Sequence, residues 1–482
     1  MSKYGQRRHC HVTHKRANMT SAAVQESNRN MPDMVLQSAR SFDEIPGPRS
    51  YPVIGGLVHI FPGGQFHGMH PNDKQSLCQE MYGNIYKEVL VPGMEFVHIF
   101  DPVDIEKVFR GDQEFPVRQA FFTLDFYNRK YNKQQGLLTS QGENWHRIRK
   151  NVQQKMLRPK AVTAYLPEQT IVADELLEHV RKLKDDNSEV ADLRPEFDKY
   201  AAECVGVVCF NKRLQAFDDD PDSEAANFIK AVDTIMYILS TKYTALHLEE
   251  MEKADDEADG EHGDLIPYLL SKTSLSQEDV LTVISEFIFA GVDTTSHHLS
   301  FMMYLLGKNP EVQEKLSEEI QANIPNKQQI TSSILSKMSY LRAVTKETHR
   351  LLPVAPGNVR TSSQDLVLSG YHVPAGKNIV MHHTWIMLQD EHFKDALAFK
   401  PERWIRNNES HHNAHPFAML PFGHGVRSCI GRRLAEQEAQ IAIIKILQNF
   451  KVEYTGEPLQ TVHSITVTPI SKMRFRLTER YL

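Results

Sequence analysis

The strongest chemical signal in this 482-residue sequence is the run Phe422-Gly423-His424-Gly425-Val426-Arg427-Ser428-Cys429-Ile430-Gly431. A helix is predicted to begin near Gly431, so Cys429 lies in a glycine-bearing loop directly before a helix. Backbone N–H groups of such a loop and of a helix start stabilise negative charge, and they favour the thiolate form of a cysteine. The glycines beside His424 would let the backbone approach the sulfur, where a side chain would clash. The run therefore predicts that Cys429 can be stabilised as a thiolate; the alternative is a buried structural cysteine in a turn.

Composition restricts the class of protein around this loop. Apolar residues make up 41% of the chain and charged residues 24%, a soluble globular balance that excludes disordered, collagen-like and multi-span membrane proteins. The formal charge of -6 gives no overall attraction to nucleic acid, so any basic surface must be local. Five cysteines without a C-x-x-C pair argue against a disulfide framework or a zinc knuckle. No apolar run approaches the roughly 18 residues that a membrane-spanning helix needs.

The beginning of the chain differs in composition from the rest. Residues 1–40 are rich in Arg, Lys, Ser, Thr and Asn and poor in acids, which is typical of a mitochondrial transit peptide and equally of an ordinary basic tail. The prolines of Ile45-Pro46-Gly47-Pro48 then exclude a helix and mark the start of the folded part. We therefore predict a leader over 1–40 and a folded part from about residue 41, whose length fits two or three packed subdomains or one large enzyme domain.

Local patterns alternate between short strands and long helices. Asn84 to Phe100 is rich in β-branched and aromatic residues and is broken by Pro92-Gly93, which predicts a hairpin. Helical spacing dominates residues 140–350. Short strands are predicted again at Leu366–Leu368 and Ile379–Met381.

Two of the predicted helices carry unusual residue combinations. In Ala290-Gly291-Val292-Asp293-Thr294-Thr295, a glycine beside hydroxyl residues costs helix stability. This cost is explained if the helix opens a groove here, with the Thr294 hydroxyl hydrogen-bonding locally. In Glu347-Thr348-His349-Arg350, an acid and an arginine three residues apart share one side of a helix, where a bidentate pair can form.

Taken in order, these segments resemble the signature motifs of the cytochrome P450 family. The cysteine loop is similar to F-x-x-G-x-R-x-C-x-G, residues 290–295 to A/G-G-x-D/E-T-T/S, and residues 347–350 to E-x-x-R. Pro401-Glu402-Arg403-Trp404 is similar to P-E-R-F/W, and the resemblance runs from the proline segment to about residue 480. It implies the cytochrome P450 fold, mainly α with a smaller β-rich lobe, and one haem-thiolate catalytic domain over 41–482.

The resemblance also implies roles for single residues. Cys429 would bind the iron of haem b (iron protoporphyrin IX), and Thr294 and Asp293 would deliver protons. Glu347, Arg350 and Arg403 would form a structural network. The other cofactor-binding residues would be Phe422 of the cysteine loop and four that hold the haem propionates, namely Trp145, Arg149, Arg360 and Arg427. Arg360 has an open alternative as a surface arginine.

The implied activity is that of a monooxygenase, which inserts one oxygen atom of O2 into a lipophilic, steroid-like or xenobiotic substrate. The basic leader resembles that of the mitochondrial animal clan, whose members take electrons from a ferredoxin. That partner would dock near Arg342, Lys346, Arg432 and Arg433; Arg342 and Lys346 could instead be ordinary solvent charges. The implied location is the matrix side of the inner mitochondrial membrane, with peripheral membrane association and no nucleic-acid partner. The alternative is a microsomal enzyme of the endoplasmic reticulum that uses a diflavin reductase.

One segment departs from the resemblance. Residues 228–265 are shorter than the two helices and loop that would roof the substrate pocket, and they are strongly acidic. They indicate a reduced roof or an incomplete product, so a catalytically silent haem-binding protein stays open as an alternative. The histidine pairs 297–298, 382–383 and 411–412 lack a spaced carboxylate or cysteine, which argues against a second metal site.

Overall fold

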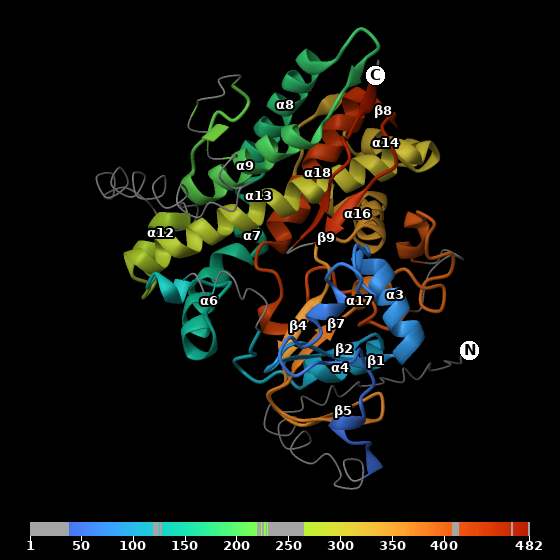
Figure 1. Cartoon of the computed structure of the whole chain (residues 1–482). Helices are drawn as coiled ribbons and strands as arrows, with labels where there is room; N and C mark the ends of the chain where they lie inside the picture. Colours follow the sequence, from blue (N-terminus) through green and yellow to red (C-terminus); the bar gives the residue numbers. More distant parts are fainter. Residues whose placement is uncertain are drawn as a thin grey trace, which may run out of the picture.

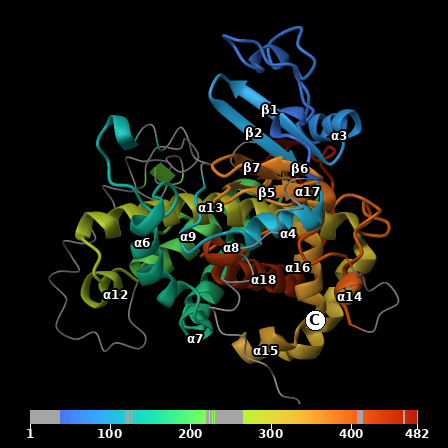
Figure 2. The same ribbon diagram turned by 90° about the horizontal axis from the view of Figure 1, so that it is seen from below.

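The computed structural model describes residues 38–118, 128–218, 265–406, 414–463 and 466–480, with single residues 125, 223, 226, 227 and 229 between them. In these ranges the chain forms a large helical lobe and a smaller lobe around a β-sheet, seen from two directions in Figures 1 and 2. The predicted mainly α fold with a smaller β-rich lobe is confirmed. Most of the 1–40 leader, most of the 228–265 segment and the pair 411–412 lie outside the described residues.

Thirteen helices and eleven strands make up the described chain, together with short 3-10 turns. The helices are α3 (Pro71–Tyr82), α4 (Pro102–Arg110), α6 (Gly142–Met156), α7 (Pro159–Thr163), α8 (Leu166–Leu183), α9 (Arg194–Phe210), α12 (Leu265–Lys272), α13 (Gln277–Lys308), α14 (Pro310–Asn323), α15 (Ser332–Lys337), α16 (Ser339–Leu351), α17 (His383–Ile386) and α18 (Arg432–Asn449). The 3-10 turns are η1 (Phe42–Glu44), η2 (Leu57–His59), η3 (Pro325–Lys327), η4 (Pro401–Trp404) and η5 (Gly425–Arg427). The strands are β1 (Ile85–Val91), β2 (Met94–Ile99), β3 (Glu189–Val190), β4 (Asn358–Thr361), β5 (Leu366–Leu368), β6 (Tyr371–Val373), β7 (Asn378–Met381), β8 (Phe450–Tyr454), β9 (Thr461–His463), β10 (Val467–Pro469) and β11 (Phe475–Glu479).

The helical lobe is organised around α13, which runs through its middle (Figure 1). The helix begins after Ser276, whose hydroxyl accepts from the N–H of Asp279 while the Asp279 carboxylate accepts from the N–H of Ser276. Its first half joins the apolar core that also contains Trp145 of α6, and its second half joins the core beneath α8, α14 and α18. This buries most of α13 and places residues 290–295 at the centre of the lobe. None of the helices in the described ranges is apolar enough over sufficient length to cross a bilayer.

The smaller lobe contains a four-stranded sheet in the order β1-β2-β7-β4. β1 and β2 pair antiparallel from Ile85 opposite Ile99 to Val91 opposite Met94, which confirms the hairpin at Pro92-Gly93. β7 is parallel to β2, and β4 is antiparallel to β7. The sheet thereby carries β4 and its Arg360 toward the cysteine loop.

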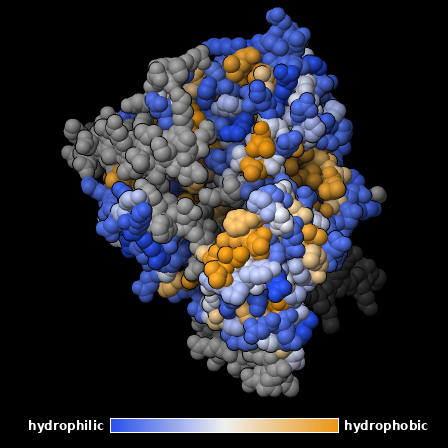
Figure 3. Space-filling view, viewed as in Figure 1, coloured by the Kyte–Doolittle hydropathy of each residue, from blue (hydrophilic) through white to orange (hydrophobic). Residues whose placement is uncertain are grey.

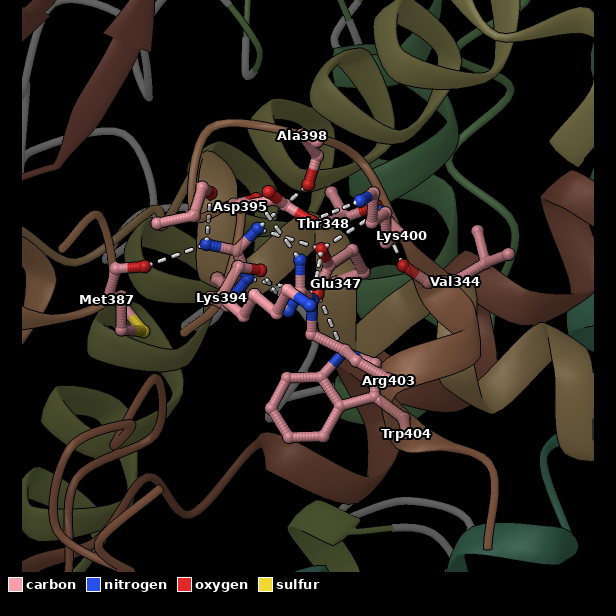
Figure 4. A network of polar contacts seen from close by, with 12 residues as sticks. Val344, Glu347, Thr348, Met387, Lys394, Asp395, Ala398, Lys400, Arg403 and Trp404 are labelled. Atoms are coloured by element: carbon pink, nitrogen blue, oxygen red, sulfur yellow. Dashed lines mark hydrogen bonds and ion pairs between the residues drawn. The ribbon is translucent and has the colours of Figure 1, made fainter. Parts of the chain in front are cut away.

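A buried ion network joins α16 to the segment that precedes the cysteine loop (Figure 4). Arg350 donates from Nη2 and Nε to the two carboxylate oxygens of Glu347 at 2.8 and 3.0 Å, and Arg403 Nε donates to Oε1 at 2.9 Å. The Trp404 indole N–H donates to Oε2 at 2.8 Å. The predicted network of one acid and two arginines is therefore present.

Candidate active site

The cysteine loop, 422–431, contains η5 and leads directly into α18. The N–H of Cys429 donates to the carbonyl of Phe422 at 2.8 Å, which closes the loop. Gly423 and Gly425 have φ values of +69° and +74°, in the left-handed region that favours glycine. The expectation that they make room for the sulfur is wrong: a Cβ at Gly423 would meet Asn358 Oδ1 at 3.0 Å, not the sulfur. These glycines are required by backbone conformation.

Cys429 combines access with an interior environment. The residue is exposed, so the alternative of a buried structural cysteine is wrong. Desolvation by the surrounding protein nevertheless raises the pKa of its thiol. The backbone N–H groups of Gly431 and Arg432 and the charges of Arg149 and Arg118 act in the opposite direction and lower that pKa. The predicted stabilisation of a thiolate by the loop and the helix start is thus present, in opposition to a larger effect of burial.

Three of the predicted cofactor-binding arginines converge on this loop from different elements. Arg149 of α6 donates from Nη2 to the carbonyl of Ser428 at 2.9 Å. Arg427 of the loop donates to the carbonyl of Pro116 at 2.6 Å and to Gln141 Oε1 at 2.8 Å. Arg360 of β4 donates to Asp112 Oδ2 at 3.0 Å and is 2% exposed, so the surface-arginine alternative is wrong.

Arg118 is a fourth arginine of this cluster, and the sequence reasoning missed it. Burial, followed by repulsion from Arg360, lowers the pKa of its guanidinium to about 10, and Arg149 and Cys429 also interact with it electrostatically. The pKa of Arg149 is likewise lowered to about 10, and that of Arg427 to about 9, by desolvation first. No motif marks Arg118 in the sequence, since its position follows from the path of the chain before α6.

The buried guanidinium groups of this cluster have the chemistry to bind an anion. Among the described residues, Arg427 Nη1 and Arg149 Nε are buried without a hydrogen-bond partner. Asp112 interacts with Arg360 and Arg427, and Glu286 with Arg118. Buried cations are normally paired, so the arrangement fits a ligand with two carboxylates next to the sulfur. The residues therefore fit a haem, whose two propionates would pair with the arginines.

The two predicted aromatic residues, Trp145 and Phe422, each contact an arginine near the cysteine loop. The guanidinium carbon of Arg427 is 4.0 Å from the ring centroid of Trp145, which is 2% exposed. Trp145 thus orients Arg427 by a cation–π contact. Phe422 is half-buried and lies between the ring of His349, 4.9 Å away, and the guanidinium of Arg432, 5.3 Å away.

Thr294 and Asp293 of α13 make contacts within and beyond the helix. The Thr294 hydroxyl donates to the carbonyl of Ala290 at 2.6 Å, which confirms the predicted local hydrogen bond. Asp293 accepts from the Thr466 hydroxyl at 2.8 Å and lies 3.3 Å from His297 Nε2. Gly291 allows α9 to approach, because a Cβ there would be 2.7 Å from Val205 Cγ2. The glycine is thus explained by helix packing, whereas the sequence suggested an opened groove.

The four basic residues predicted to bind a redox partner are exposed. Arg342 donates to the carbonyls of Leu335 and Ser336 at 3.0 and 2.8 Å. Lys346 lies 5.6 Å from the ring centroid of Trp404, and Arg432 pairs with Glu436 at 3.1 Å. Arg342 and Lys346 lie on α16. Arg432 and Arg433 lie at the start of α18, which directly follows the cysteine loop.

The histidine pairs separate in the structure. His297 faces Asp293, whereas His298 stacks on His349 at 3.9 Å, and His382 shares a hydrogen bond of 2.8 Å with His98. Over the described ranges, no group of three or more His, Cys, Asp or Glu side chains is placed to hold a metal ion.

Comparisons with known proteins agree with this geometry. The family model "Cytochrome P450" matches residues 45–249 and 239–475. The chain is 30% identical to "Cytochrome P450 302a1, mitochondrial" of Drosophila melanogaster, over 87% of this chain and 91% of the relative. It is 28% identical to "1,25-dihydroxyvitamin D(3) 24-hydroxylase, mitochondrial" of Mus musculus, over 91% of this chain and 89% of the relative. The crystal structure of the cytochrome P450DA heme domain superposes with a TM-score of 0.76 at 23% identity, covering 90% of this chain and 96% of that one. The chain belongs to the cytochrome P450 family of monooxygenases.

Proposed function

We propose that this protein is a mitochondrial haem-thiolate monooxygenase that hydroxylates a lipophilic substrate with electrons from a ferredoxin. The reaction consumes a substrate C–H bond, O2, two electrons and two protons, and it yields the C–OH product and one water. The observation that carries the proposal is the accessible thiol of Cys429 beside Arg149 and Arg427, each of which has one buried guanidinium nitrogen without a hydrogen-bond partner among the described residues. When bound, a thiolate-ligated haem b supplies the activation of dioxygen.

The chain's own residues would hold this cofactor at two places. The sulfur of Cys429 would bind the iron, and the N–H groups of Gly431 and Arg432 would favour its thiolate form. Arg149, Arg360 and Arg427 would bind the propionates, with Trp145 orienting Arg427 and Phe422 packing beside the ligand loop. Arg118 joins this set because of its electrostatic contact with Cys429 and Arg360.

Thr294 and Asp293 would supply the protons of the reaction. Asp293 keeps 32% of its side-chain surface exposed, so its carboxylate can exchange protons with solvent. Thr294 is the next residue along α13, and its hydroxyl can turn from the carbonyl of Ala290 toward a bound ligand. His297 and Thr466 hold the carboxylate from two sides and limit its rotation.

The proposed electron donor is an acidic ferredoxin. Exposed cations lie on α16 and at the start of α18 of this acidic chain, and we expect them to form a local basic surface that orients an acidic partner. The relatives named as mitochondrial support a mitochondrial location, and the matrix side of the inner membrane is the finer location that we propose.

A lipophilic substrate and a membrane surface fit together in this proposal. One of the similar relatives is named as a hydroxylase of a dihydroxyvitamin D, which supports a steroid-like substrate class. Apolar surface occurs in separate patches on the face shown in Figure 3. Three large apolar side chains near η2 are exposed: Val53 (85%) and Ile54 (43%) before the turn, and Phe61 (56%) after it. These side chains would allow peripheral membrane association, from which a lipophilic substrate could enter.

The proposal is tested on purified haem-loaded protein. After reduction under carbon monoxide, the wild type should show the Soret band of a thiolate-ligated haem, and Cys429→Ala should lose it. Turnover of a steroid panel should be supported by ferredoxin with its reductase. Turnover with a diflavin reductase alone would favour the microsomal alternative, and a thiolate-type band without any substrate-induced spin shift would favour a silent haem-binding protein.

A further inference from the structure

Glu286 is a buried acid of α13 that the proposed reaction does not use. It lies one helical turn before Ala290 and is 2% exposed. Its carboxyl group faces the segment 136–141, which leads into α6. The N–H of Leu138 donates to Glu286 Oε2 at 3.1 Å, and the N–H of Leu137 also stabilises its negative charge.

Gly136 shows how closely this segment fits around the acid. A Cβ added at Gly136 would overlap the carboxyl carbon and both oxygens of Glu286. The absent side chain therefore creates the space in which the carboxyl group lies. Glu286 and Gly136 form a matched pair, because a larger residue at one position requires a smaller residue at the other.

The far end of the same segment holds two of the clustered arginines. The N–H of Ser140 donates to the carbonyl of Gly136 at 2.9 Å, which transmits the position of Gly136 along the turn. Gln141 Oε1 accepts from Arg427 Nη2 at 2.8 Å and from the N–H of Arg118 at 3.1 Å. Gln141 Nε2 donates in turn to the carbonyl of Arg118 at 2.7 Å. Gln141 thus fixes Arg118 and Arg427 relative to each other.

We propose that Glu286 is a positioning residue for the cofactor: by anchoring 136–141 to α13, it holds Arg118 and Arg427 where they bind the haem propionates. The inference rests on the proposed function. Its electrostatics agree, since burial raises the pKa of Glu286 to about 8 and Arg118 is the charged group that faces it. The acid can therefore anchor the segment in its neutral form at neutral pH, without adding a buried negative charge.

The experiment measures the rate at which haem leaves the loaded protein for an excess of apomyoglobin, a readout that needs no turnover. Glu286→Ala should release haem roughly tenfold faster, as expected when a hydrogen bond to a buried group is lost. Glu286→Gln keeps the shape and an acceptor oxygen and should stay within about twofold of the wild type. Glu438→Ala is a matched control, because Glu438 is also a buried acid with a pKa raised to about 8, but it bonds to Gln169. It should lower the melting temperature without a comparable rise in haem release.

A second variant keeps the proposal testable if Glu286→Ala does not fold. Gly136→Ala should speed haem release by collision with the carboxyl group, and the double variant with Glu286→Ala should release haem no faster than Glu286→Ala alone. Release from Glu286→Ala and Gly136→Ala at the wild-type rate would overturn the inference while leaving thiolate-ligated haem intact. Failure of the wild type itself to bind haem would instead overturn the proposed function.

Discussion

Replacing Glu347 by glutamine tests whether the buried ion network stabilises the fold. Five N–H groups converge on its carboxylate: those already described from Arg350, Arg403 and Trp404, and the backbone N–H of Lys400 at 3.0 Å. Glutamine keeps one oxygen, so at least the two donors that face Oε2 lose their acceptor. At about 1–3 kcal/mol for each unsatisfied buried donor, the loss is roughly 2–6 kcal/mol.

An independent estimate leads to the same range. Removing one partner of a buried ion pair typically costs about 3–5 kcal/mol, because the remaining charge is left uncompensated. Glu347 and Arg350 are 0% exposed and Arg403 is 2% exposed, so water cannot replace the lost acceptor. A domain has only about 5–15 kcal/mol of total stability, so the change removes a large fraction of it.

The assay is equilibrium urea unfolding of the haem-free protein, followed by circular dichroism, so that bound ligand does not contribute. Glu453→Gln is the control, because Glu453 pairs with Arg476 at 2.9 Å on the surface, with the two side chains 60% and 41% exposed. It should change the free energy of unfolding by less than about 0.5 kcal/mol. If Glu347→Gln also stays within about 1 kcal/mol of the wild type, the attribution of stability to this network is refuted.

Further predictions concern the site and its charges. Gly423→Ala should destabilise the protein by about 1–2 kcal/mol in the same urea assay, because φ is +69° there and the new methyl group would contact Asn358. Arg149→Gln should raise the melting temperature of the haem-free protein, because burial of its guanidinium is costly and its Nε has no hydrogen-bond partner among the described residues, and it should speed haem release from the loaded protein. Burial raises the pKa of both Glu286 and Glu438 from 4.5 to about 8, so the folded state retains protons that the unfolded chain releases. Stability should therefore fall as the pH rises from about 4.5 to about 8, and glutamine at both positions should flatten this slope in urea titrations at several pH values.

Structural features that depend on residues close together in the chain were predictable from the sequence. The turn at Pro92-Gly93 sets the register of β1 and β2 over a few residues, so local chemistry determines it. The pairing of Glu347 with Arg350 follows from helical spacing in the same way. Arg403 was found only because a resemblance linked distant motifs, and Arg118 was missed because no motif marks it. Its place in the cluster depends on Gln141, which lies 23 residues further along the chain.

The sequence predicted which glycines matter better than it predicted why glycine is needed there. The sequence correctly singled out Gly423 and Gly291, but it connected both with access to the ligand site. The structure assigns Gly423 to a left-handed turn and Gly291 to close contact with Val205. The first requirement depends on the backbone path of the loop and the second on the helix that packs against α13, and composition and spacing contain neither.

The two arginine clusters of this protein differ in how their charge is compensated, and the difference separates a structural role from a binding role. Around Glu347, two buried arginines direct their N–H groups to one carboxylate and to carbonyls of the segment 387–398, so that network needs nothing more. Around Cys429, three of the four arginines interact with Asp112 or with Glu286, whose raised pKa leaves it mostly neutral at pH 7. In the part of the chain that the structure describes, Arg149 Nε and Arg427 Nη1 of this second cluster are buried without a hydrogen-bond partner, so it keeps positive charge that protein groups do not satisfy. Such charge is costly unless a dianionic ligand offsets it, which is why removing one of these arginines should stabilise the empty protein and weaken the loaded one.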